Sequence, residues 1–109
     1  MSDKIINTFQ QRRQLQERIG LLEGTKTEAE MLKIVRSIAH EFPSEMILKA
    51  LLKALNTSNS QLRGGLAHLS TMLPPEDVID TLRNAVGDRG NPTYTRLNSI
   101  TILERFLGE

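Results

Sequence analysis

The chain has 109 residues, of which 39% are hydrophobic and 25% are charged, and its formal net charge is +1. These values are close to the average for folded globular proteins, and they argue against a disordered chain or one steered by charge toward nucleic acid. The absence of cysteine excludes disulfides, thiolate catalysis and cysteine-based zinc sites, and it suits a reducing compartment. No stretch approaches the roughly 18 apolar residues of a membrane span, and the first ten residues lack the apolar core of a signal peptide. The expected location is the cytoplasm, with no membrane contact.

Apolar residues recur three and four positions apart along nearly the whole chain, which is the spacing of amphipathic helices. The first predicted helix extends from about Ile6 to Leu22 and has Arg12 and Arg13 on its apolar face. A second helix is predicted after Gly24. Its capping box and apolar stripe are Thr27 with Glu30, followed by Met31, Leu32, Val35, Ile38, Ala39 and Phe42.

Four further helices are predicted, separated by Pro43, by the polar turn 56–60, by the Pro74–Pro75 pair and by the turn 87–92. Ser44 is the expected N-cap of the third helix. The apolar stripes of the third to fifth helices are Ile47, Ala50, Leu51, Ala54 and Leu55, then Leu62, Leu66, Leu69 and Leu73, then Val78, Ile79, Leu82, Ala85 and Val86. The sixth is expected to bury Leu97, Ile100, Leu103 and Leu107 and to end at Gly108, which tolerates a positive φ. Six helices would form three hairpins.

The chain also repeats itself. Residues 42–51 match residues 73–82 at an offset of 31, and both have the pattern apolar-Pro-x-Glu-x-aliphatic-aliphatic-x-x-Leu. For the sixth helix two offsets from the fourth compete: 34 places Ile100 on Leu66, whereas 33 places Arg96 on Arg63 but Ser99 on Leu66. We favour 34, because burying one Leu or Ile side chain stabilises by about 1.5–3 kcal/mol and a match of exposed arginines adds almost nothing.

This pattern, over roughly residues 28–107, resembles the HEAT-like helical repeats of the short type found in bacterial proteins. The signature residues of tetratricopeptide and ankyrin repeats, which have similar periods, are missing. The resemblance implies an all-α fold, a right-handed α-α superhelix of about three helical hairpins. The expected organisation is a single domain over residues 1–109, with repeat units at about 1–42, 43–73 and 74–108.

No group of residues combines an acid, a base and a nucleophile at a workable spacing, so we expect no enzymatic activity, no catalytic residue and no cofactor. His40 and His68 lack a second ligand at the i+3 or i+4 spacing of helical metal motifs, so no metal is expected. The acidic residues 76, 77 and 80 begin a helix, where negative charge complements the helix dipole. Gly64 and Gly65 lie inside a helix, where each costs about 1 kcal/mol relative to alanine, and we expect another backbone to approach closely there.

The sixth helix is the expected site of protein binding. Ile102 and Phe106 are predicted to point away from its buried face, and with Leu107 they are the candidate protein-binding residues. The last repeat of a solenoid needs a polar outer side, so another protein, a second copy of the chain or a further repeat would cover this one. The predicted function is a non-enzymatic protein–protein interaction scaffold, or the N-terminal part of a larger HEAT-like repeat protein.

Two alternatives stay open. In the first, the chain is a nucleic-acid-binding regulatory domain in which Arg12, Arg13 and Arg18 of the first helix contact successive phosphates. The near-zero net charge and the lack of interleaved aromatic residues make nucleic acid the less favoured partner. In the second, which only the family resemblance suggests, the chain is an accessory subunit of a cofactor-bearing protein.

Overall fold

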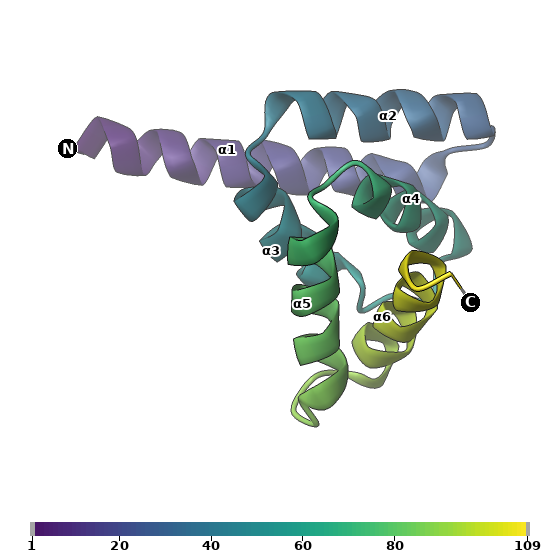
Figure 1. Ribbon diagram of the computed structural model, residues 1–109. Helices are drawn as coiled ribbons and strands as arrows, with labels where there is room; N and C mark the ends of the chain where they lie inside the picture. The colour runs from purple at the N-terminus through teal and green to yellow at the C-terminus, as the bar shows by residue number, and fades with distance from the viewer. Residues whose placement is uncertain (1, 109) are drawn as a thin grey trace.

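The structure, a computed structural model, describes the backbone of residues 2–108 and the side chains of residues 8–108. Within this part the chain is helical throughout, with short connections and no β-strand (Figure 1). The elements are α1 (Ser2–Leu21), the short 3₁₀ helix η1 (Leu22–Gly24), α2 (Glu28–Glu41), α3 (Ser44–Ala54), α4 (Ser60–Thr71), α5 (Pro75–Gly87) and α6 (Thr93–Phe106). The all-α prediction is therefore confirmed.

Local hydrogen bonds explain where two of the helices begin. Thr27 Oγ1 accepts a hydrogen bond from the Glu30 N–H at 3.1 Å, and the Glu30 carboxylate accepts one from the Lys26 N–H. Asn59 Oδ1 caps α4 in the same way, accepting from the Leu62 N–H at 2.8 Å. The Thr27 cap is as predicted. Ser44 is not a cap, because α3 begins at Ser44 itself, following Pro43.

The helices pack against both consecutive and alternate neighbours in the chain. In Figure 1, α1 and α2 lie side by side and antiparallel, and α5 and α6 form the most extensive helix pair. Between these two hairpins, α3 packs on α1 and α5, while α4 packs on α2 and η1. The middle hairpin is looser, since α3 and α4 make little contact with each other.

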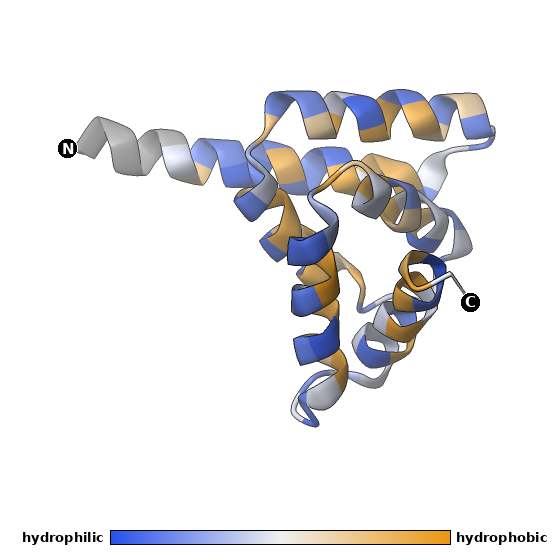
Figure 2. Ribbon diagram, in the orientation of Figure 1, coloured by the Kyte–Doolittle hydropathy of each residue, from blue (hydrophilic) through white to orange (hydrophobic). Residues whose placement is uncertain are grey.

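The buried apolar side chains form one contiguous core that includes residues of every helix. Figure 2 shows α5 with its hydrophobic side turned toward α6 and its hydrophilic side turned outward. Each large aliphatic side chain buried in this way stabilises the folded chain by about 1.5–3 kcal/mol. The large hydrophobic residues of the core that are fully buried are Leu15, Leu22, Val35, Ile38, Ile47, Leu51, Leu55, Leu66, Leu69, Val78 and Leu82.

The prediction for the buried face of α6 is wrong. Thr95, Asn98, Ser99, Ile102 and Leu103 are buried, whereas three of the four predicted core residues are largely exposed. These three are Leu97 at 53%, Ile100 at 39% and Leu107 at 51% exposure. The rejected offset of 33 fits instead. It places the N-cap of α4, position 59, on the N-cap of α6, position 92. It also places the buried positions 62, 66 and 69 of α4 on the buried positions 95, 99 and 102 of α6.

Hydrogen bonding explains why α6 buries polar residues on this face. Ser99 Oγ donates to the Thr95 carbonyl at 2.6 Å. Asn98 Nδ2 donates to the Leu55 carbonyl at 2.7 Å and to the Thr57 carbonyl at 3.0 Å, so it fastens α6 to the turn after α3. A buried polar group that keeps its hydrogen bonds costs little, whereas an unpaired one costs about 1–3 kcal/mol. A prediction from apolar residues alone therefore assigned the wrong face of α6 to the core.

At Gly65, α4 lies very close to η1. A Cβ atom added at Gly65 would lie 2.8 Å from Leu22 Cδ1, in the fully buried side chain of η1. A Cβ at Gly64 would meet only the Met31 sulfur, at 3.9 Å. The predicted close approach is thus found at Gly65, against a side chain rather than a backbone, and it is not found at Gly64.

Candidate functional site

The structure places the three predicted protein-binding residues in different surroundings. Ile102 is only 3% exposed and belongs to the core, which contradicts its predicted outward position. Phe106 is half-buried and packs against the core. Leu107, just after α6, is exposed. The prediction for Ile102 was wrong because it used the offset of 34. With the offset of 33, Ile102 corresponds to Leu69, which is buried.

The outward side of α6 carries a different set of apolar residues, which we call the outer face of α6. Its members are Tyr94, Leu97, Ile100 and Leu107, exposed by 39–53%. Spacings of three and seven residues place them on one side of the helix, because each residue turns about 100°. Seven large hydrophobic residues are exposed in the described part of the chain, and four of them lie here. From the sequence, Leu97, Ile100 and Leu107 were predicted as core residues, and Leu107 was also named as a protein-binding candidate.

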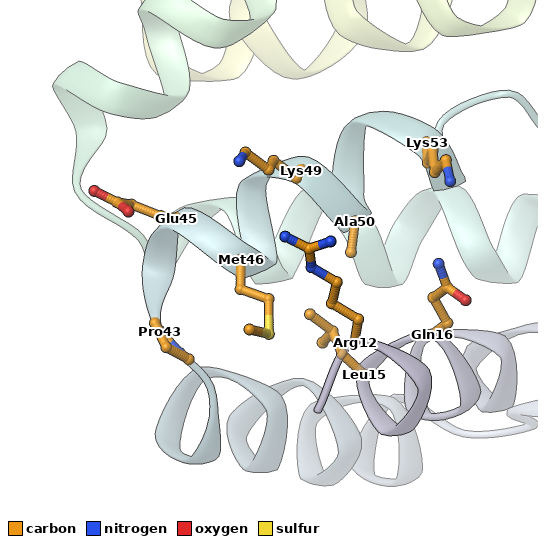
Figure 3. Close-up of a pocket in the computed structure, with 9 residues that line it drawn as sticks. All are labelled: Arg12, Leu15, Gln16, Pro43, Glu45, Met46, Lys49, Ala50 and Lys53. Atoms are coloured by element: carbon orange, nitrogen blue, oxygen red, sulfur yellow. The ribbon is translucent and has the colours of Figure 1, made fainter. Parts of the chain in front are cut away.

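A second surface feature is a groove of about 500 Å³ between α1 and α3, which we call the α1–α3 groove (Figure 3). It contains three cationic side chains, one carboxylate and an apolar floor. The lining residues are Arg12, Leu15, Gln16, Pro43, Glu45, Met46, Lys49, Ala50 and Lys53. An adjoining hollow of about 300 Å³ shares Gln16, Ala50 and Lys53 with it and continues the groove toward η1.

Helical spacing explains how the groove is built. Glu45, Lys49 and Lys53 stand four residues apart on α3, so they form one row along its surface. The side chain of Arg12 extends from α1 toward α3, and its guanidinium lies between Met46 and Ala50 in Figure 3. The sequence shows the row on α3 but does not show that Arg12 faces it.

Arg12 and Gln16 of α1 line the same groove as the lysines. In Figure 3, Lys49 projects above the Arg12 guanidinium, and the Gln16 amide lies below the end of Lys53. The structure gives no carboxylate partner to Arg12, Lys49 or Lys53 among the described side chains, where the ion pair found is Arg18 with Glu41. The groove therefore presents its positive charge to solvent.

The three arginines proposed for nucleic-acid binding do not form one surface. Arg18 is paired with Glu41 of α2, donates to Ser37 Oγ at 3.4 Å, and lies 5.6 Å from the centre of the Phe42 ring. These contacts fasten α1 to α2. Arg13 is exposed but does not line the groove, so Arg12 alone of the three does.

The structure offers no other concentration of chemical groups among residues 8–108. No set of three or more His, Cys, Asp or Glu side chains in this range could hold a metal ion. Glu76 and Asp77 lie exposed in the first turn of α5, as helix-dipole complementation predicts. No helix within the described residues combines the length and apolar character needed to cross a membrane.

Comparison of the chain with protein-family models, with curated proteins and with solved structures gives no match. The two surfaces described above are therefore the basis on which a function can be proposed.

Proposed function

We propose that the chain is a HEAT-like helical-repeat module that binds another protein, or a second copy of itself, through the outer face of α6, without catalysing a reaction. The repeat of 31 residues, together with the packing of α3 on α1 and α5 and of α4 on α2, supports the HEAT-like assignment. The observation that carries the binding proposal is the row of exposed apolar side chains at Tyr94, Leu97, Ile100 and Leu107.

The fold leaves part of the apolar surface of α6 uncovered. The opposite side of α6 is already in the core, and about half of Leu97 and of Ile100 remains exposed to solvent. Full burial of one such side chain is worth about 1.5–3 kcal/mol, and these are about half exposed, so a partner would gain roughly half of that at each. Tyr94 adds an aromatic side chain, of a type enriched at the energetic centres of interfaces.

Site-specific photo-crosslinking tests this surface. A photoreactive phenylalanine analogue at position 97 should yield a discrete crosslinked protein in cells that express the chain, because Leu97 would lie inside the interface. Position 21 is the matched control, since Leu21 is also an exposed leucine, at 60%, but lies at the end of α1. A product of twice the chain's mass would identify a second copy as the partner.

Adding Ile100→Glu to the chain with the analogue at position 97 should remove the crosslinked product, because a charge would be buried in the interface. Circular dichroism should show unchanged helix content, since Ile100 is exposed. No product at position 97, or equal products at positions 97 and 21, would contradict the proposal.

A further inference from the structure

The α1–α3 groove lies on different helices from the outer face of α6, and its chemistry is different. We propose that this groove binds a short acidic segment of another protein, one that carries at least two carboxylates and an apolar side chain. Two features of the groove support this inference: its charge and its floor.

The groove carries a net positive charge, whereas the rest of the chain does not. Arg12, Lys49 and Lys53 against Glu45 give the lining a net charge of +2, whereas the whole chain has +1, so the remaining residues sum to −1. Lys53 taken alone has a structural explanation, because it lies in the last turn of α3, where a cation complements the helix dipole. Lys49 follows Glu45 by four residues, a spacing at which the two can interact along a helix, but no carboxylate among the described side chains lies within ion-pair distance of Lys49 or Arg12.

The cations of the groove come from two helices, which suits a ligand with more than one carboxylate. Lys49 and Lys53 are four residues apart on α3 and so lie on one side of that helix. Arg12 of α1 lines the same groove (Figure 3). Hydrogen bonds from these three side chains to the carboxylates of a ligand would be charge-assisted.

The floor of the groove favours a peptide over nucleic acid. Leu15 is fully buried beneath it, and Met46 and Ala50 are half-buried along it, so an apolar side chain of a ligand would find apolar neighbours. Methionine adapts its shape to such a side chain easily. A phosphate backbone would leave this floor uncovered and would need a longer track of cations, which Arg13 and Arg18 do not extend.

Selection from a random peptide library tests the proposal. The immobilised chain should enrich peptides with at least two Asp or Glu residues and one large apolar residue, after counter-selection on the Lys49→Gln/Lys53→Gln variant. A fluorescein-labelled copy of an enriched peptide should then bind the double variant about tenfold more weakly, as measured by fluorescence anisotropy. Amides in place of the peptide's carboxylates should weaken binding to a similar degree.

The matched control is Lys26→Gln/Lys33→Gln, which removes the same charge from exposed positions outside the groove. This variant should change the affinity less than about twofold, and Leu97→Glu should leave it unchanged, because α6 is a separate surface. Enriched peptides without an excess of carboxylates, no groove-dependent peptide, or equal losses in both double variants would overturn the proposal. So would tighter binding of a short single-stranded DNA that the groove variant abolishes, since the groove would then serve a phosphate backbone.

Discussion

Gly64 and Gly65 stand next to each other in α4 and face different surroundings. An added Cβ would meet the buried methyl groups of Leu22 at 2.8 and 2.9 Å at Gly65, whereas at Gly64 it would make an ordinary contact with Met31. Leu22 is fully buried, so its side chain has little room to move away. The two glycines therefore give a matched test of how tightly α4 packs on η1.

Gly65→Ala should lower the free energy of unfolding by about 1–3 kcal/mol, the usual cost of overpacking a core. Gly64→Ala should raise it by up to about 1 kcal/mol, because alanine is the better helix former and no clash opposes it. Urea denaturation followed by circular dichroism measures both values. Equal effects of the two substitutions would mean that Leu22 yields to the added methyl group and that the contact is not tight.

At the scale of elements, Asn98 connects segments more than 40 residues apart. Its amide donates to two carbonyls in the turn after α3, at Leu55 and Thr57, and it is buried. The same turn also positions Asn59, the N-cap residue of α4, because the Asn59 N–H donates to Thr57 Oγ1 at 3.1 Å. One side chain of α6 thus fixes the connection between α3 and α4, which make little contact with each other.

Asn98→Ala should destabilise the chain by about 1–2 kcal/mol, because the Thr57 carbonyl would lose its amide donor and the Leu55 carbonyl would keep only the Thr57 N–H. Asn84→Ala is the matched control: Asn84 is exposed on α5, and its replacement should change the free energy of unfolding by less than about 0.5 kcal/mol. Thermal or urea unfolding of the two variants decides the matter. A loss at Asn98 no larger than the loss at Asn84 would show that water replaces the amide without cost.

The same residue shows how far sequence reasoning could go. The helices and their order could be predicted from the apolar periodicity, the cap at Thr27 and the prolines. Each of these signals depends only on residues that are close together in the sequence. The buried face of α6 was missed, because Asn98 and Ser99 are buried through hydrogen bonds that no spacing of apolar residues reveals, and the partners of Asn98 are distant in sequence.

The two candidate surfaces could be predicted only in part from the sequence, because each also depends on how the helices pack. The charge of Lys49 and Lys53 and their common side of α3 can be read from the sequence, but the approach of Arg12 from α1 is a tertiary fact. The outer face of α6 depends on the helix's orientation, which the apolar pattern alone misassigned.

At the scale of the whole molecule, the contiguous core decides how the chain unfolds. In a repeat array whose units contact only their neighbours, terminal units can unfold separately. Here the core joins residues of α1 to residues of α6, and Asn98 ties α6 to the middle of the chain. We therefore expect one cooperative transition, as for a small single domain.

The sequence supplies a convenient probe, because Tyr94 is the one tyrosine of the chain and there is no tryptophan. Tyr94 lies on the exposed side of α6, so its fluorescence reports on the C-terminal hairpin, while circular dichroism reports on all helices together. In a urea titration the two signals should have the same midpoint, and Asn98→Ala should shift both by the same amount. If the Tyr94 signal changed at lower urea than the helix signal, α5 and α6 would be an independent unit, and the molecule would behave as a stack of separable repeats rather than as one cooperative fold.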